Sequence, residues 1–357
     1  MLPLNKLLQA VIDLRGSDLH LAVGRPPTIR HHGRLRSLDL AVLGPDDTHA
    51  FMKAITPDRC QVELNELGTT DFGFAFGTEA RFRVSVFKQK GVLGIALRLI
   101  PSQLMSFEEI GLPPSVKILL LKPRGLFLVT GPTGCGKTTT LATMIDFINT
   151  EATQHIITLE DPIEYYHEHR ASIITQREIG VDCPSFSEGL RRALRQDPDV
   201  ILVGEMRDLD TIESAIRAAE TGHLVLGTLH TTGAYKTIDR IIGVFPTNQQ
   251  EQIRTQLSTS MLAVISQQLL PTADGKGRVA VFEIMIMKPS IQNLIRKNET
   301  FKINSVIQTG EREGMILLDN HLCQLYMSGQ VTFSEMMKSA VNPEELEKKV
   351  KLLAAAK

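Results

Sequence analysis

The sequence of 357 residues contains no tryptophan and only four tyrosines. So few large aromatic side chains argue against an aromatic-rich binding face. An excess of charge is also missing, because 39 lysines and arginines stand against 40 aspartates and glutamates, and the formal net charge is -1. No global basic field therefore attracts nucleic acid or an anionic membrane surface, although a local basic patch stays compatible with this balance.

Cysteine pairs and long apolar runs are missing as well. The four cysteines are scattered with no CxxC pair, so neither a disulfide framework nor a zinc site is indicated, and we expect reduced thiols in a cytosolic protein. They are Cys60, Cys135, Cys183 and Cys323. Asp13 and Arg15 interrupt the N-terminal apolar stretch, and no run approaches the ~18 apolar residues of a membrane span. Any work at a membrane is then expected to be peripheral.

The hydrophobic pattern divides the chain into two regions. Residues 1–100 show one amphipathic helix followed by short alternating segments, which predicts a small α+β domain. Residues 101–114 combine prolines and a glycine, and we expect a linker there. From residue 115 onward, short apolar strands alternate with helices, which indicates a mainly parallel sheet covered by helices. Beyond Pro246 the pattern becomes mostly helical and predicts a long helix over about 249–269, a β-like hairpin around 277–287, and several shorter helices to the end.

A phosphate-binding loop is the strongest single signal. GPTGCGKT, residues 131–138, follows the apolar strand 126–129 and precedes a helical run, the context that a Walker A loop requires. Its glycines let backbone amides curl around phosphate, and the helix N-terminus adds partial positive charge. We expect Lys137 to reach the β- and γ-phosphates of ATP and the hydroxyl of Thr138 to ligate Mg²⁺. The residues predicted to bind the nucleotide are Gly131, Pro132, Thr133, Gly134, Cys135, Gly136, Lys137, Thr138 and Thr139.

Two strands ending in carboxylates supply candidate acids. The apolar run 200–203 leads to Glu205, as a Walker B strand leads to its metal-side acid. A second cluster, Glu160-Asp161-Pro162-Ile163-Glu164, follows the strand after the P-loop helix. We expect Glu164 to polarise the attacking water and Glu160 to lie beside the metal, although an acidic turn of this kind is also compatible with a simple solvated loop.

Histidine and arginine add further candidates. His230 ends the apolar strand 224–229, where it could respond to the γ-phosphate or simply be a hydrogen-bonded structural residue. Arg81 and Arg83 alternate on a predicted N-terminal strand. Arginines on a strand often face solvent, but a multimeric ATPase commonly neutralises transition-state charge with arginine, so these two are candidates for that role. Cys135 near a helix N-terminus is expected to have a lowered pKa and raised reactivity.

Four ordered motifs resemble those of the secretion ATPases of type IV pilus and type II secretion systems, and within them the retraction, PilT-type, branch. GPTGCGKT resembles the family's Walker A, and ITLEDPIE (157–164) its Asp box. DPDVILVGEMRD (197–208) resembles Walker B, and TGHLVLGTLHTT (221–232) the His box. The resemblance spans nearly the whole chain. A further element, SIQNLIR (290–296), is similar to the C-terminal motif of the retraction branch, with Ser290 and Gln292 departing from it.

The resemblance implies an α/β protein with a PAS-like α+β N-terminal domain at 1–100, a linker at 101–114, and a RecA-like P-loop ATPase domain at 115–357 with a helical C-terminal part. It implies a homohexamer that couples hydrolysis of ATP, with Mg²⁺, to type IV pilus retraction, pilin depolymerisation and twitching motility. By resemblance, Glu164, Glu205 and His230 are catalytic, Thr138, Glu160 and Glu205 lie at the metal, and Arg81 and Arg83 approach ATP.

The resemblance also implies a place and partners. We expect a cytoplasmic protein at the cytoplasmic face of the inner membrane, acting on a PilC-type platform protein and without nucleic acid. Two alternatives stay open: an accessory PilU-type retraction ATPase, which would also be a candidate partner, and a RecA-like nucleic-acid translocase. The near-neutral charge and scarce aromatics argue against the translocase, which needs a basic channel and stacking residues.

Overall fold

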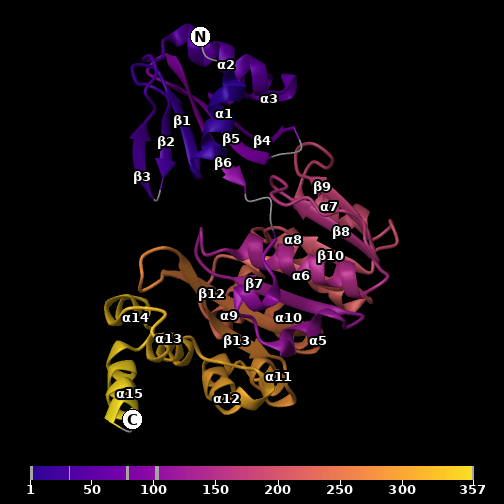
Figure 1. Ribbon diagram of the computed structural model, residues 1–357. Helices are drawn as coiled ribbons and strands as arrows, with labels where there is room; N and C mark the ends of the chain where they lie inside the picture. Colours follow the sequence, from indigo (N-terminus) through magenta and orange to yellow (C-terminus); the bar gives the residue numbers. More distant parts are fainter. Residues whose placement is uncertain (1–2, 32, 78–79, 101–103, 356–357) are drawn as a thin grey trace. The chain divides into compact units, whose positions relative to one another are not determined.

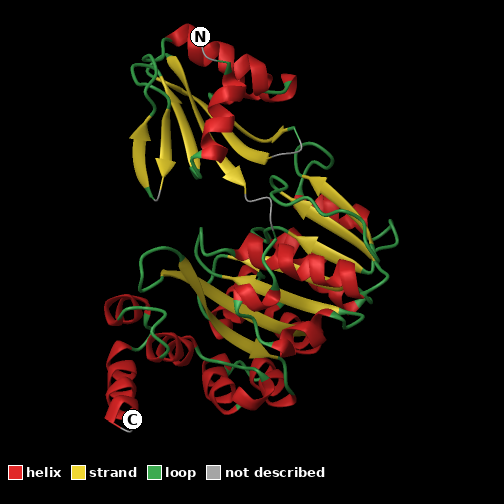
Figure 2. Ribbon diagram, in the orientation of Figure 1, coloured by secondary structure: helices red, strands yellow, loops and turns green. Residues whose placement is uncertain are grey.

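The computed structural model describes residues 3–31, 33–77, 80–100 and 104–355. The chain divides into two compact units, Met1–Leu104 with Pro162–Tyr166, and Met105–Asp161 with His167–Lys357. Each unit has its own sheet and helices (Figures 1 and 2). In the part of the chain that is described, no helix combines the length and the apolar character needed to cross a bilayer.

The first unit is built on an antiparallel sheet of six strands in the order β3-β2-β1-β6-β5-β4. Alternate side chains of its central strands, such as Phe82, Val84 and Val86, are fully buried beneath the helices. The α+β prediction for this region is confirmed. Its elements are α1 (Leu4–Asp13), β1 (Asp18–Ala22), β2 (Thr28–His31), β3 (Arg34–Ser37), α2 (Pro45–Ile55), α3 (Asp58–Leu67), β4 (Thr69–Phe76), β5 (Ala80–Gln89) and β6 (Val92–Ile100).

The second unit is built on a sheet of seven strands in the order β13-β12-β7-β11-β10-β8-β9. All neighbouring pairs are parallel except β12 with β13, so the predicted mainly parallel sheet is confirmed. The strands are β7 (Gly125–Thr130), β8 (His155–Glu160), β9 (Ile173–Glu178), β10 (Val200–Val203), β11 (Leu224–Leu229), β12 (Met261–Pro271) and β13 (Arg278–Ile286).

Helices cover both faces of this sheet. Leu126 and Leu128 of β7 belong to one buried cluster, whereas Phe127 and Val129 belong to the other, because successive side chains of a strand point to opposite faces. The helices are α4 (Phe107–Ile110), α5 (Pro114–Leu120), α6 (Lys137–Glu151), α7 (Phe186–Ala193), α8 (Leu209–Glu220), α9 (Ala234–Val244), α10 (Gln250–Ser260), α11 (Pro289–Arg296), α12 (Ile303–Thr309), α13 (Leu318–Met327), α14 (Phe333–Ser339) and α15 (Pro343–Ala355), with short 3₁₀ turns at Thr300–Lys302 and Glu311–Glu313.

The predicted helix over 249–269 is wrong in its second half. Helix α10 ends at Ser260, and β12 runs from Met261 to Pro271 beside β7. The run MLAVI at the start of β12 is apolar on both faces of the strand because both are buried, and periodicity cannot separate such a strand from a buried helix. The predicted hairpin near 277–287 is correct in its second strand, and β12 is its partner.

The predicted linker begins at residues 101–103, which lie outside the described part of the chain. Its remainder contains α4, which a capping box starts: Glu109 N donates to Ser106 Oγ (3.1 Å), and Ser106 N donates to Glu109 Oε2 (2.7 Å). Phe107 and Ile110 of α4 are buried against the second unit. The domain boundaries 1–100, 101–114 and 115–357 stay a prediction.

Candidate nucleotide site

The predicted site residues of the second unit come from the carboxyl ends of neighbouring parallel strands. The P-loop follows β7, His230 follows β11, Glu205 follows β10, and Glu160 ends β8. Since β7, β11, β10 and β8 are consecutive in the sheet and parallel, these side chains share one edge. In open α/β sheets this edge is where ligands bind.

The P-loop has the backbone shape that curls around phosphate. Gly131 has φ 142° and Gly136 has φ 89°, values that side-chain-bearing residues rarely adopt, and a Cβ on Gly131 would overlap the carbonyl oxygen of Gln267. Helix α6 begins at Lys137, so its first amides point outward without acceptors in the helix. Pro132, Thr133 and Gly134 are exposed. The loop therefore presents backbone donors at an accessible surface.

Lys137 is held against the loop that it belongs to. Its ammonium donates to the carbonyl oxygens of Gly131 (2.8 Å) and Pro132 (3.2 Å). Burial lowers the pKa of the Lys137 amine from its ordinary value, although the charges of Cys135 and Glu205 act in the other direction. Thr138 and Thr139 follow in the first turn of α6.

Glu205 lies at the centre of a polar cluster. His230 Nε2 is 2.8 Å from Glu205 Oε1, and Arg207 Nε donates to the same oxygen. On its other side, His230 Nδ1 lies 3.5 Å from Thr133 Oγ1 of the P-loop. Burial raises the pKa of Glu205, but the hydrogen bond and charge of Arg207, with those of His230, outweigh it and hold the pKa below its ordinary value. The carboxylate is thus ionised beside the phosphate-binding loop.

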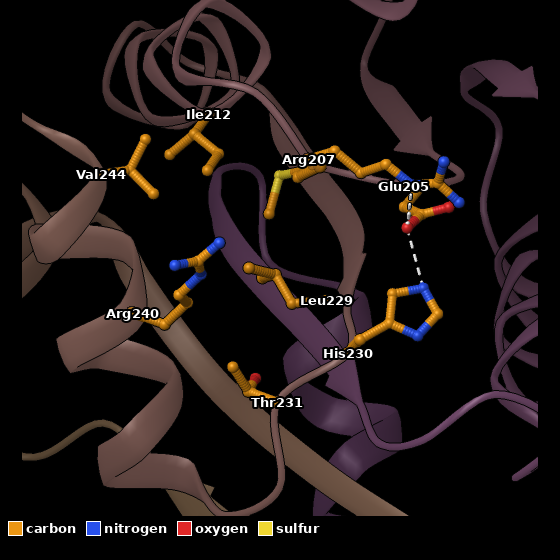
Figure 3. A pocket seen from close by; sticks show the side chains of 9 residues that line it. Glu205, Arg207, Ile212, Leu229, His230, Thr231, Arg240 and Val244 are labelled. Atoms are coloured by element: carbon orange, nitrogen blue, oxygen red, sulfur yellow. Dashed lines mark hydrogen bonds and ion pairs between the residues drawn. The ribbon is translucent and has the colours of Figure 1, made fainter.

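A cavity of about 350 Å³ adjoins this cluster. Glu205 and His230 point toward each other at one end, and Arg240 of α9 points between Leu229 and Val244 (Figure 3). Arg240 was not among the residues predicted for the site. Arg207 was part of the quoted Walker B motif, but no role was predicted for it; its position two residues after Glu205 was the available signal.

Glu160, at the carboxyl end of β8, is hydrogen-bonded to side chains of the same sheet. Its Oε1 accepts from Thr158 Oγ1 (2.6 Å) and Gln176 Nε2 (3.1 Å), and the residue is only 9% exposed. Among the described residues, no group of three or more histidine, cysteine, aspartate or glutamate side chains is arranged to hold a metal ion. Mg²⁺ needs no such cage, because it is usually bound by one or two protein ligands together with phosphates and water.

Glu164, Arg81 and Arg83 lie in the first compact unit, which includes the segment Pro162–Tyr166. Arg83 Nη1 is 3.9 Å from Glu164 Oε1. The guanidinium of Arg81 lies over the ring of Tyr166, 4.1 Å from its centroid. The structure therefore brings the two predicted arginines together with the end of the Asp box, and Tyr166 is an addition that sequence reasoning missed.

The expectation of a reactive Cys135 thiol is wrong. Cys135 is 3% exposed, and burial raises its pKa, although Lys137 acts in the opposite direction. The thiol precedes the first residue of α6 by two positions and lies under the loop, where lost hydration outweighs the helix end and the nearby ammonium.

A strand, a glycine-rich loop and a helix N-terminus beside an ionised carboxylate define a P-loop nucleotide-binding protein. The family model for type II/IV secretion system proteins matches residues 68–338, and the chain belongs to this family. The type IV pilus retraction ATPase PilT of Pseudomonas aeruginosa is 48% identical over 328 residues, 92% of this chain and 95% of that protein. PilU of the same organism, a type IV pilus ATPase, is 39% identical over 347 residues, 97% and 91% of the two chains.

A solved structure shows the same arrangement. The crystal structure of the pilus retraction motor PilT with bound ADP superposes with a TM-score of 0.91 at 46% identity, covering 98% of this chain and 100% of that one. The chain is therefore a nucleotide-binding ATPase of the PilT type, and the predicted α/β fold with a RecA-like ATPase domain and a smaller N-terminal domain is confirmed.

Proposed function

We propose that this protein is a motor that couples ATP hydrolysis to retraction of a type IV pilus. The observation that carries the proposal is similarity along nearly the whole chain to proteins named for that task, together with the intact cluster of Lys137, Thr138, Glu205 and His230. Similarity confined to the P-loop would support no more than nucleotide binding.

The P-loop is the proposed binding site for the phosphates of ATP. Backbone amides of residues 133–139 hold the phosphate oxygens, and Lys137 moves its donors from the loop carbonyls to the β- and γ-phosphates. The exposed loop with left-handed glycines fits this ligand, since no atom lies within 4 Å of the place that a Cβ on Gly134 would take.

The donor set at the sheet edge also fits Mg²⁺, which prefers hard oxygen ligands. Thr138 and Glu205 are the proposed metal-side residues, and Glu160 supports them from the end of β8. When bound, the ion would neutralise phosphate charge as it develops in the transition state. The hydroxyl of Thr138 makes no side-chain hydrogen bond with the described residues, which leaves it available for this role.

Glu205, Glu164 and His230 carry the proposed chemistry. Glu205 is ionised and acts on the metal side, and Glu164 orients the attacking water. His230 lies between Glu205 and Thr133, so a change at the phosphate loop alters its hydrogen bonds directly. We propose that His230 reports the state of the γ-phosphate to β11 and α9.

The proposed assembly is a homohexamer at the cytoplasmic face of the inner membrane, acting on a PilC-type platform protein and using no nucleic acid. Arg81 and Arg83 supply positive charge to ATP within this ring, and residues 101–114 serve as the hinge of the power stroke. The relatives and the cluster of four motifs support this assembly by analogy.

An accessory PilU-type ATPase is the second candidate, because the similarity to PilU covers as much of the chain as the similarity to PilT does. The sequence GEMRD around Glu205, with Arg207 bonded to that carboxylate, favours the principal motor.

Deletion of the gene in its native host tests the proposal. A principal retraction motor predicts cells that carry excess pili and do not twitch, and complementation by the wild type but not by Glu205→Gln. Bald cells would indicate an extension motor and contradict the proposal. Piliated cells that still retract would assign the accessory role. Strong stimulation of ATPase activity by single-stranded DNA would instead indicate a translocase.

A further inference from the structure

Strand β12, which lies between β13 and β7 in the sheet of the second unit, presents two neighbouring polar side chains. Ser266 is 4% exposed and Gln267 is 1% exposed. Neighbouring side chains of a strand point to opposite faces, so these two contact different structures. Polar groups buried this deeply cost free energy unless they are hydrogen-bonded, which makes their partners informative.

Gln267 is hydrogen-bonded to the P-loop and its helix through both atoms of its amide. Nε2 donates to the carbonyl oxygen of Cys135 (2.6 Å), and Oε1 accepts from the hydroxyl of Thr140 in α6 (2.9 Å). The N–H and C=O of a peptide unit point in opposite directions. Because the Cys135 carbonyl points at β12, the amide of Gly136 points away from β12. Gln267 thus sets the direction of a donor within the phosphate-binding loop.

Ser266 and its neighbour on β13 hold the segment after the His box. Glu283 is paired with Ser266 across the two strands. Ser266 Oγ accepts from the amide of Gly233 (2.9 Å), and Glu283 Oε1 accepts from the amide of Ala234 (2.7 Å). These two amides start α9, three and four residues after His230.

Glu283 is buried at this point without a basic partner. It is 6% exposed and forms no ion pair with any described side chain. Its carboxylate accepts from the backbone amide of Ala234 at the start of α9, and burial raises the pKa of the Glu283 carboxyl although this hydrogen bond acts in the other direction. The N-terminus of α9 favours negative charge and so offsets part of this burial cost.

We propose that the β12–β13 hairpin is a positioning element for both nucleotide-facing loops. Gln267 positions the P-loop amides, and Ser266 with Glu283 positions His230 through the turn at Gly233 and Ala234. The proposal rests on the function proposed above for the P-loop and His230. It separates two tasks: Gln267 governs nucleotide affinity, and Glu283 governs turnover.

The first test compares Gln267→Met with Gln268→Met. Methionine has nearly the length of glutamine but forms neither hydrogen bond. Gln268, on the other face of β12, makes no side-chain hydrogen bond with a described residue and provides a matched control. Without the hydrogen bond from Gln267 to the Cys135 carbonyl, nucleotide binding must itself order the loop amides, and ordering one or two residues weakens affinity by about 5- to 100-fold. We therefore expect the KM for ATP, and the Kd for a fluorescent ADP analogue, to rise by that factor with kcat within about twofold.

Unchanged nucleotide affinity in Gln267→Met, with a wild-type melting curve, would overturn the role of Gln267. So would an equal loss of affinity in the control. If Gln267→Met does not fold, Gln267→Glu takes its place, because glutamate keeps the acceptor for Thr140 but loses the donor to the Cys135 carbonyl.

The second test compares Glu283→Leu with Glu283→Gln. Leucine removes the acceptor for the amide of Ala234, and glutamine restores an acceptor without the charge. We expect Glu283→Leu to lower kcat at least about tenfold with little change in Kd, and Glu283→Gln to recover most of the rate, because a misplaced group costs rate rather than binding. A change in Kd alone, or failure of glutamine to recover the rate, contradicts the assignment.

The proposed function and the positioning role of the β12–β13 hairpin can fail separately. Nucleotide affinity is measured without hydrolysis, so Gln267 is tested even if the wild type proves inactive, which would end the proposed function. If Glu205→Gln abolishes hydrolysis while the Gln267 and Glu283 variants behave as wild type, the proposed function stands and the positioning role of the hairpin falls.

Discussion

Replacing Glu205 with glutamine isolates the charge of one carboxylate. The amide is of the same size, so His230 and Arg207 keep a neighbour, but it cannot hold a negative charge beside the phosphates. Groups positioned to stabilise developing charge contribute about 10²–10³ in rate, and we expect kcat to fall by that factor. Nucleotide binding should change little, because the P-loop itself is intact.

The cost of this substitution to folding is small. Arg207 is 77% exposed and Glu205 19%, and an ion pair with one exposed partner contributes at most about 1 kcal/mol. In a chain of this size, that corresponds to a shift of less than about 4 °C in the melting temperature. A lost rate therefore cannot be ascribed to unfolding when the melting curve is preserved.

Steady-state phosphate release, with affinity measured by a fluorescent ADP analogue, provides the assay. Glu213→Gln is the matched control, since it breaks a 2.8 Å ion pair with Arg217 on α8 by the same chemical change. We expect wild-type turnover from the control. Equal turnover of wild type and Glu205→Gln would refute the assignment of Glu205, and a loss of nucleotide affinity equal to the loss of rate would show that Glu205 acts in binding.

Three further outcomes follow from particular residues. Cys135 should react with iodoacetamide far more slowly in the native protein than in urea, as peptide mass spectrometry will show, because burial raises its pKa and covers the thiol; equal rates would contradict this. Gly131→Ala should weaken nucleotide affinity, because a non-glycine backbone at φ 142°, with its Cβ against Gln267, stores about 1–3 kcal/mol of strain. Unchanged nucleotide binding would show that the loop relaxes freely. Burial lowers the pKa of His321 below its ordinary 6.5, so the stability contributed by the buried neutral imidazole is complete above pH 6.5 and is lost as pH falls. His321→Gln should therefore flatten the decline in melting temperature between about pH 7 and 5. An unaltered slope would contradict the direction of this pKa shift.

The strands of the nucleotide site could be predicted because their signals are local. The run 126–129 is apolar throughout and leads into a glycine-rich loop, and it lies within β7, Gly125–Thr130. The run 200–203 was likewise predicted at its observed bounds. Parallel strands buried on both faces read as continuous apolar runs, and the residues that follow them must then share one edge.

The roles of Gln267 and Glu283 could not be predicted in the same way. Each is a polar residue in an apolar run, and what it contacts lies far along the chain, at Cys135 and Ala234. The wrongly predicted helix over 249–269 made the role of Gln267 harder to identify, since Ser266 and Gln267 would not point to opposite sides on a helix. The pKa of Cys135 was mispredicted for a related reason: the helix end was visible in sequence, but the burial that outweighs it was not.

The position of β7 between β11 and β12 has a consequence for how the protein is made. The strand that carries the P-loop pairs on one side with residues about 100 positions later and on the other with residues about 130 positions later. Ribosomes add roughly 5–20 residues per second, so the emerging β7 waits on the order of 7–26 seconds before β12 exists to flank it. Throughout that interval the unpaired backbone groups and apolar side chains of β7 are open to other chains, so the strand that carries the P-loop is exposed to aggregation before its second partner is made.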